Sequence, residues 1–455
     1  MKWIGRYRVM KLLGQGGMGR IYKVFRPELG RVMALKLLKP EQLQEDLWGA
    51  EELRRLFFQE VRIMGGLDHE NVAAVLDLGE AEGRPFAVLE YYCLNLGTLI
   101  GETYRMEAPT RRLMPEKAID YAQQALNGLG RLHHAGIVHR DVKPYNLMVT
   151  RDDCIKLIDF GLSRLRGERP PRRPKGAIIG SPYYAAPEQE SHPDQAGPQA
   201  DLFSLAVLFY RLLTGSLPDE GLKALEGETF YSQAWSDFFR KALSQEPSRR
   251  YADAWEMHEA LQQLKESWRE ARDRACKLSQ GGLHREAHEA PSTPPRSRPM
   301  RTGPVKMVPF PGLTDLYQPA VYQPNAFRRR GESCLEDRSS GLIWLVKAPP
   351  LALSWEEAWS YAASLSEEPG NQAEPWRLPT VEELLTLLQP RFRPEDFCVP
   401  AVLGGQKRCL WSADERTCSA AWFVDAENGS VLWQDKTCAF WVLPVRSGQE
   451  SSDRA

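Results

Sequence analysis

The sequence predicts an α+β protein with two folded regions joined by a linker, and three observations lead to this prediction. First, a chain of 455 residues is longer than one hydrophobic core usually organises. Second, residues 7–265 show strand patterns followed by helical ones, whereas residues 269–315 are rich in Pro, Ser and Arg. Third, eight tryptophans follow residue 340, which is enough for a second, independent core.

Composition excludes several classes of protein. The chain is 42% hydrophobic and 26% charged with a formal net charge of -1, so no charge excess points to nucleic acid or a membrane surface. The start, MKWIGRYRV, has no apolar core of signal-peptide length, and no uninterrupted apolar run is long enough to span a bilayer. We therefore expect a cytoplasmic protein with no nucleic-acid partner and no membrane span.

The cysteine pattern predicts reduced thiols. None of the eight cysteines lies in a CxxC pair, and five follow residue 330, an odd number for a closed disulfide set. We expect these five to be mostly reduced and buried. A zinc site built from Cys409, Cys418 and Cys438 is the alternative, although no His lies in that region to complete a familiar ligand pattern.

Residues 7–36 are expected to form three strands joined by tight turns. Gly14, Gly16 and Gly19 form a GxGxxG arrangement, in which backbone amides can approach phosphate oxygens without interference from Cβ atoms. This motif alone is weak, because turns between strands also collect glycine. Lys36 lies in the apolar strand RVMALKLL and would need a buried carboxylate partner.

The segment 51–64 supplies a candidate for that partner. Its apolar positions recur at helical spacing and predict an amphipathic helix; they are Leu53, Leu56, Phe57, Val61 and Met64. Glu60 lies among them, so we pair it with Lys36. Glu51 and Glu52 are the alternatives, and both are expected to be exposed on the first turn.

The stretch VHRDVKPYNLMVTRDDCIKLIDFG, residues 138–161, carries the chemistry. It follows DHENVAAVLDLGE and RPFAVLEYY, which predict two further strands, and a helix that Pro115 begins. Phosphoryl transfer needs a carboxylate to orient the attacking hydroxyl, a cation near the migrating phosphoryl group and oxygen ligands for Mg²⁺. Asp141, Lys143, and Asn146 together with Asp159 fit these three roles in that order.

The HRDxxxxN and DFG motifs in this stretch resemble those of eukaryotic-like (Hanks-type) bacterial protein kinases. The resemblance implies a bilobal protein kinase fold over residues 1–268, with ATP and Mg²⁺ as cofactors. It implies that Asp141, Lys143 and Asn146 are catalytic and that Asn146 and Asp159 bind the metal. The residues implied to bind ATP are Leu13, Gly14, Gly16, Gly19, Ile21, Ala34, Lys36, Glu60, Leu89, Glu90 and Tyr92. Leu89 would be the gatekeeper, and backbone groups of Glu90 and Tyr92 would contact adenine.

The same resemblance extends to structural positions. Asp201 matches a residue that braces the catalytic loop, and Arg250 matches one that pairs with Glu188 of the APE element. In the activation segment 161–188, Ser181 stands where the family usually has Thr, and Ser163 is the only other hydroxyl residue before it. Acceptors are therefore scarce, which argues against activation by loop phosphorylation despite the many arginines.

Residues 269–315 are expected to be a flexible linker, because Pro, Ser and Arg prevent a packed core. Contact of its basic residues with acidic surfaces is the alternative to a solvated tether. Beyond it, the pattern predicts a strand (GLIWLV), a helix (SWEEAWSYAASL), a second helix (VEELLTLL) and short strands at LWSAD, AAWFVDAENGSVLW and AFWVLPVR. Thr380 caps the second helix, with Glu383 at the capping-box position.

This last region resembles the Lcl C-terminal-like family, which is related to the C-type-lectin and formylglycine-generating-enzyme folds. The matching motifs are DxxTGLxW at 337–344, WxxA at 355–358, WRLPTxxEL at 376–384, WSS (here WSA) at 411–413 and VR at 445–446. The resemblance implies a small α+β C-type-lectin-like domain over residues 316–455. We expect most of its tryptophans in the core and Arg377 to anchor backbone. With no acid dyad or catalytic Cys pair, it is expected to be a sensory or target-binding module for an unknown ligand or partner.

The function expected from the sequence is a serine/threonine protein kinase that transfers the ATP γ-phosphate to hydroxyls of protein substrates. Lys143, two residues after Asp141, favours Ser/Thr over Tyr by resemblance. Two alternatives remain: a nucleotide-binding scaffold without turnover, and a binding protein whose C-terminal module carries the main role.

Overall fold

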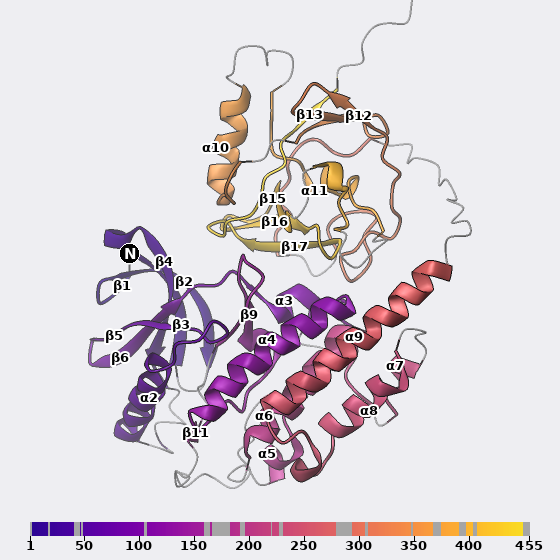
Figure 1. Ribbon diagram of the computed structural model, residues 1–455. Coiled ribbons are helices and arrows are strands. Elements are labelled where there is room, and N and C mark those ends of the chain that lie inside the picture. Colours follow the sequence, from indigo (N-terminus) through magenta and orange to yellow (C-terminus); the bar gives the residue numbers. More distant parts are fainter. Residues whose placement is uncertain are drawn as a thin grey trace, which may run out of the picture. The chain divides into compact units, whose positions relative to one another are not determined.

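The computed structural model describes residues 2–16, 19–40, 46, 49–103, 107–158, 164–165, 183–191, 196–219, 221–226, 231–278, 294–304, 308–346, 349–366, 375–390, 397–403 and 407–448. The chain divides into two compact units, Met1–Gln280 and Gly281–Ala455. The first unit holds an antiparallel sheet and a group of helices, and the second is a smaller α+β unit (Figure 1).

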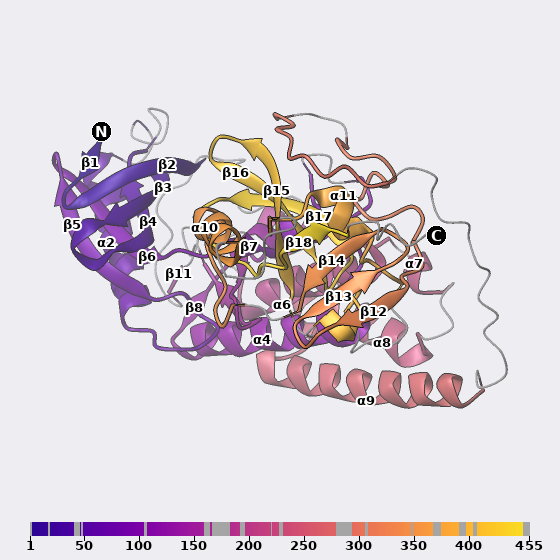
Figure 2. The same cartoon turned by 90° about the horizontal axis from the view of Figure 1, so that it is seen from above.

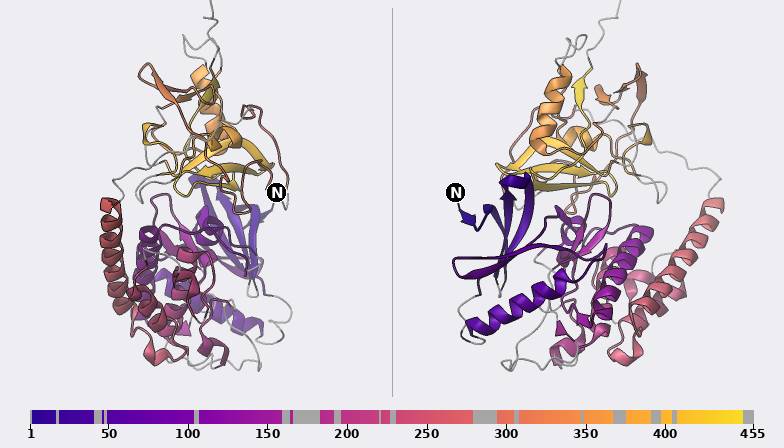
Figure 3. Two further views of the ribbon diagram at one scale, coloured as in Figure 1. Left: turned by 90° about the vertical axis from the view of Figure 1, so that its right-hand side faces the viewer. Right: turned by 60° about the vertical axis from the view of Figure 1, so that its left-hand side comes forward.

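The sheet of the first unit has the strand order β1-β2-β3-β4-β6-β5. The strands are β1 Trp3–Ile4, β2 Tyr7–Gly16, β3 Gly19–Arg26, β4 Arg31–Leu38, β5 Val75–Ala81 and β6 Arg84–Glu90. Helix α2, Ala50–Gly65, packs against it (Figure 1; Figure 3). Its buried face consists of Leu53, Phe57, Val61 and Met64, which confirms the amphipathic helix predicted from their spacing.

The remaining helices of this unit surround α6, Pro198–Thr214, whose side chains are almost all buried. The others are α3 Leu96–Ile100, α4 Pro115–His134, α5 Pro187–Ser191, α7 Lys223–Glu226, α8 Gln233–Ala242 and α9 Ala254–Leu278. Helices α4 and α9 lie side by side (Figure 2). Two small sheets complete the unit: β7 Leu94–Asn95 with β9 Leu147–Val149 and β10 Ile155–Leu157, and β8 Ile137–Val138 with β11 Arg164–Leu165.

The second unit contains two antiparallel sheets and two helices. One sheet has the order β12-β13-β14-β18 and the other β15-β16-β17. Their bounds are β12 Phe327–Arg330, β13 Cys334–Asp337, β14 Leu342–Leu345, β15 Cys409–Thr417, β16 Ala420–Asp425, β17 Ser430–Asp435 and β18 Val445–Ser447; the helices are α10 Trp355–Ser366 and α11 Val381–Leu385. Strands β12 and β13 were not predicted, because the run Phe327–Arg330 is mostly charged and exposed at a sheet edge.

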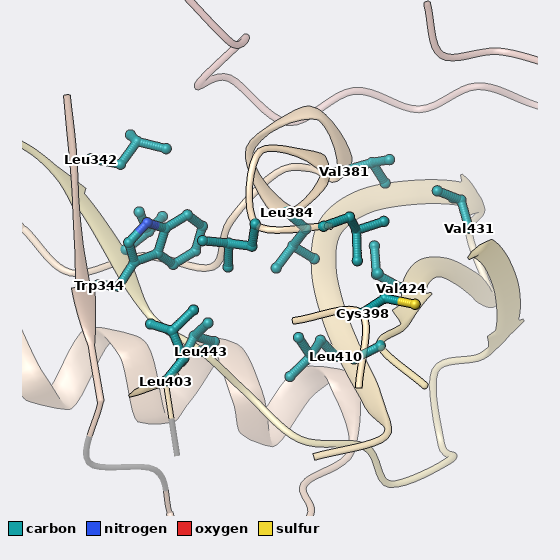
Figure 4. Close-up of a cluster of buried hydrophobic side chains, with 14 of the residues drawn as sticks. Leu342, Trp344, Val381, Leu384, Cys398, Leu403, Leu410, Val424, Val431 and Leu443 are labelled. Atoms are coloured by element: carbon teal, nitrogen blue, oxygen red, sulfur yellow. The ribbon is translucent and has the colours of Figure 1, made fainter. Parts of the chain in front are cut away.

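Tryptophan builds much of the core of the second unit, as predicted. Trp344 packs with leucines and valines from both sheets and from α11 (Figure 4). Trp376, Trp411 and Trp422 are buried too, whereas Trp433 is 39% exposed. Thr380 and Glu383 form the predicted capping box of α11. Arg377 bonds the backbone oxygen of Leu378 as expected, but its shorter bonds go to the Glu383 carboxylate, at 2.6 and 2.8 Å.

The structure differs from the linker predicted over residues 269–315. Helix α9 continues to Leu278, and residues 294–304 pack on the second unit. Arg296 donates two hydrogen bonds of 3.0 Å to the buried carboxylate of Asp414. A segment rich in Pro and Arg is ordered here because a distant buried charge needs its guanidinium, which composition does not reveal. The interval between, 279–293, lies outside the described residues.

The cysteine prediction holds in part. Four of the five cysteines after residue 330 are free thiols. Cys398 and Cys409 are buried, but Cys418 is exposed because it lies in the turn between β15 and β16. In the part of the chain that the structure describes, no three His, Cys, Asp or Glu side chains gather as a metal site, so the zinc alternative finds no support. Nor does any described helix combine the length and hydropathy needed to cross a membrane.

Candidate active site

The ion pair predicted between Lys36 and Glu60 is present. Lys36 Nζ lies 2.8 Å from Glu60 Oε1, and the two side chains are only 15% and 10% exposed. Strand register explains the meeting: Lys36 on β4 lies opposite Ala87 on β6, and Ala87 packs against Phe57 and Val61 of α2. The sheet face that carries Lys36 is therefore the face that α2 covers.

The same register gathers other predicted residues on this face. Gly14 lies opposite Ile21, Ile21 opposite Lys36, and Ala34 opposite Leu89. Directly paired residues share a face of an antiparallel sheet, and so do residues two apart along a strand. The side chains predicted to contact ATP from β3, β4 and β6 thus lie together. Leu13, by contrast, falls at a register shift between Leu12 and Gly14 and is 42% exposed.

The glycines of the hairpin serve different structural needs. A Cβ on Gly19 would lie 2.3 Å from the backbone oxygen of Leu37, so close packing on β4 requires glycine there. A Cβ on Gly14 would meet no atom within 4 Å. The space beside Gly14 is therefore open to a ligand. Gly16 pairs with Gly19 where the two strands meet the turn.

The three predicted catalytic residues lie in contact. Lys143 Nζ donates to Asp141 Oδ2 at 2.7 Å, and Asn146 Nδ2 donates to the same oxygen at 2.9 Å. Asn146 Nδ2 also donates to the backbone oxygen of Asp141 at 2.8 Å, which closes the loop on itself. These contacts keep the Asp141 carboxylate ionised and in one orientation, as a group that must accept a hydroxyl proton requires.

Asp201 of α6 holds the backbone of this loop, as the resemblance implied. Its buried carboxylate accepts from the amides of His139 and Arg140 at 2.8 and 2.7 Å. The backbone needs this support because Arg140 has a φ of 66°, in the left-handed region. Burial opposes ionisation of Asp201, but the bonds from His133, 2.8 Å away, and from the loop outweigh it and lower the pKa of Asp201. His133 thus has the structural role expected of it.

The segment after residue 182 is anchored on two sides. Arg250 and Glu188 form the predicted pair through two bonds of 2.7 Å. Gln189, which the sequence did not single out, donates to the backbone oxygen of Arg140 at 2.8 Å. Asp159, Phe160, Gly161, Ser163 and Ser181 lie outside the described residues, so the second predicted metal ligand and the two hydroxyls of the activation segment have no place in this geometry.

At the predicted hinge, Glu90 makes contacts that the sequence did not suggest. Its carboxylate lies 3.1 Å from Arg31 Nη2 and accepts from the Tyr92 hydroxyl at 3.3 Å. Burial, reinforced by the charge of Glu90, raises the pKa of Tyr92 well above its usual range. Tyr92 is therefore neutral and a donor at any physiological pH.

Comparison with known proteins divides the chain as its motifs do. Residues 7–273 match the protein kinase domain family, and residues 333–446 match the Lcl C-terminal domain. Similar curated proteins are the serine/threonine-protein kinase PrkC of Bacillus subtilis, 29% identical over 56% of this chain and 39% of that one, and Pkn1 of Myxococcus xanthus, 31% identical over 57% and 38%. PknA of Mycobacterium tuberculosis is 34% identical over 49% of each chain.

The chain thus spans half or less of the length of these relatives. Among solved structures, the kinase domain of Mycobacterium tuberculosis PknI, a double mutant, is similar over 58% of this chain and 97% of that one, with 24% identity and a TM-score of 0.44.

Proposed function

Because the chain belongs to the protein kinase domain family, we propose that it is a serine/threonine protein kinase that uses ATP and Mg²⁺. The observation that carries this proposal is the Asp141 carboxylate, held by Lys143 and Asn146 at 2.7 and 2.9 Å. A carboxylate so placed can accept the proton of an attacking hydroxyl, and the ammonium of Lys143 can stabilise charge on the phosphoryl group. The similar bacterial proteins are themselves named serine/threonine-protein kinases.

The residues present fit ATP and a divalent cation. Lys36, ion-paired with Glu60, would hold phosphates, and the open space beside Gly14 leaves room for them. Asn146 turns its amide nitrogen to Asp141, which leaves Oδ1 as the atom of that amide that can bind a cation. Mg²⁺, when bound, supplies positive charge that neutralises the phosphates. We assign Asp159 as the second ligand by resemblance alone.

We assign the second unit a binding role rather than a chemical one. Its conserved-type motif residues are used in packing and capping: Trp344 and Trp411 are fully buried, and Glu383 caps α11. Asp337, which begins the DxxTGLxW motif, accepts bonds from Ala326, Ser339 and Ser340 and so closes a turn. What remains for recognition is the surface of the unit, and its ligand is part of the proposal to be tested.

Incubation of the full-length chain with radiolabelled ATP and Mg²⁺ tests the proposal. We expect incorporation of phosphate on Ser or Thr, mapped by mass spectrometry, and loss of incorporation when EDTA removes the metal. ATP binding without phosphotransfer to the chain or to added protein would instead support the nucleotide-binding scaffold. Phosphate on Tyr alone would contradict the assigned specificity.

The ion pair of Lys36 and Glu60 gives a second test. We expect Lys36→Met to lower kcat/KM by about 10²- to 10³-fold, since it removes a preorganised positive charge from the phosphates. Glu60→Gln should cost less, because Lys36 could still reach phosphate from a displaced α2. Steady-state kinetics of both single variants and the double variant measure the coupling.

Lys11→Met is the matched control, because Lys11 is an exposed lysine on the same sheet. We expect it to leave kcat/KM unchanged. Losses from Lys36→Met and Glu60→Gln that simply add in the double variant would show that the two residues act independently.

A further inference from the structure

A buried carboxylate lies at the junction of three elements of the first unit and has no role in the chemistry described above. Glu102 follows α3, and its side chain is 1% exposed. Its Oε1 accepts from the Tyr184 hydroxyl at 2.5 Å and lies 3.5 Å from Nε of Arg211 on α6. Its backbone oxygen accepts from the hydroxyl of Tyr145, a catalytic-loop residue next to Asn146, at 2.8 Å.

The charges of this cluster are incompletely satisfied. In the described part of the chain, Glu102 Oε2 and Arg211 Nε and Nη1 are buried with no hydrogen-bond partner. Arg211 instead spends Nη2 on the backbone oxygen of Ala108 at 3.3 Å. Burial raises the pKa of Glu102, and the bond from Tyr184 acts against that shift. The Tyr184 hydroxyl is therefore the principal hydrogen bond that stabilises this carboxylate, and its loss would leave a buried acceptor unsatisfied.

Tyr184 lies where it can transmit this constraint. It begins the described segment 183–191, three residues after Ser181 in the sequence. The far end of that segment is tied to the catalytic loop by Gln189, which bonds the Arg140 backbone oxygen and accepts from the amide of Ala186. Glu102 and Gln189 thus fasten the segment to the catalytic loop on both sides of Asp141, through Tyr145 and Arg140.

We propose that Tyr184 and Glu102 are positioning residues that set the surface on which the hydroxyl-bearing protein substrate lies relative to Asp141. The inference rests on the proposed function, since it presupposes a protein acceptor. It separates two halves of the site: Lys36 and Glu60 act on ATP from the sheet side, whereas Tyr184 and Glu102 act on the acceptor from the helical side. Loss of the Tyr184 hydroxyl should therefore weaken the use of protein substrate and spare the use of ATP.

The chain offers a matched control in the neighbouring residue. Tyr183 is 42% exposed, and its hydroxyl donates to the exposed Glu107 at 2.6 Å. Tyr183→Phe therefore removes the same atom from the same segment, but from a bond that water can replace. We expect no change in any kinetic constant for this variant.

The experiment compares wild type, Tyr184→Phe and Tyr183→Phe as full-length chains, with myelin basic protein and with the inactive Asp141→Asn chain as acceptors. We expect Tyr184→Phe to raise KM for the acceptor about tenfold, equivalent to one lost hydrogen bond to a charged group. KM for ATP, and the slow hydrolysis of ATP in the absence of acceptor, should not change. Glu102→Gln keeps an acceptor oxygen for Tyr184 and should leave KM for the acceptor within about threefold of wild type.

Other outcomes are distinguishable. A fall in kcat with both KM values unchanged, together with a lower melting temperature, would mean that Tyr184 only maintains the fold and would overturn the inference. Equal rises in KM for ATP and acceptor would overturn it too. A wild-type chain that transfers no phosphate to any acceptor would instead contradict the proposed function, whatever Tyr184 does.

Discussion

Replacement of Asp141 by Asn is expected to lower phosphotransfer by about three orders of magnitude while ATP affinity stays near that of wild type. The amide has the size of the carboxylate but cannot accept the proton of the attacking hydroxyl. Its NH₂ group would also face the donors Lys143 and Asn146, which now lie 2.7 and 2.9 Å from Oδ2. Phosphate transfer to protein measures the first effect, and calorimetric titration with ATP measures the second.

Asp152→Asn is the control for this experiment. Asp152 is exposed in the turn between β9 and β10, and the same chemical change there should leave the rate unaltered. Near-normal turnover of the Asp141→Asn chain would remove Asp141 from the mechanism. Loss of ATP binding together with turnover would point to a disturbed loop rather than to a missing proton acceptor.

The second large effect is expected in the other unit, from Arg296→Leu. This change should destabilise the second unit by about 3 kcal/mol, because it leaves the fully buried Asp414 carboxylate without its counterion. The backbone amides of Met300 and Val381 would still donate to that carboxylate, at 2.8 and 2.7 Å, which keeps the loss finite. Hydrogen exchange of peptides from β15–β17 in the full-length chain, read out by mass spectrometry, reports the stability of this unit separately from the first.

Arg301→Leu is the matched control, since Arg301 pairs with Glu415 from a side chain that is 59% exposed. An exposed pair contributes about 0–1 kcal/mol, so exchange should hardly change. A fragment that begins at residue 316 lacks Arg296, Thr302 and Phe310, which bond Asp414, bond the Trp422 indole and pack on Trp422 respectively. We expect it to unfold at lower denaturant than a fragment that begins at residue 294. Equal stabilities would show that residues 294–315 are a tether after all.

Much of the proposed active site could be predicted because its residue types lie close together in the chain or on regular elements. The spacing of Asp141, Lys143 and Asn146 spans six residues, so one short loop must bring them together. Lys36 and Glu60 are 24 residues apart, but strand alternation and helical periodicity oriented both toward the same interior. The same periodicities predicted α2, α4, α6 and α10, and the local order of Thr380 and Glu383 predicted the cap of α11.

Contacts between distant residues with no periodic pattern were decided only by the tertiary structure. Arg296 and Asp414 are 118 residues apart, and Tyr184 and Glu102 are 82 apart. In the sequence, Arg296 belongs to a Pro- and Arg-rich stretch that predicts a solvated linker, and Glu102 is one acid among sixty acidic residues. Which charge becomes buried depends on how the elements pack around it, and burial, rather than residue type, makes its partner indispensable. Motif and periodicity therefore determined the chemistry of this protein and its regular elements, whereas the buried polar pairs that hold those elements in register arose from packing.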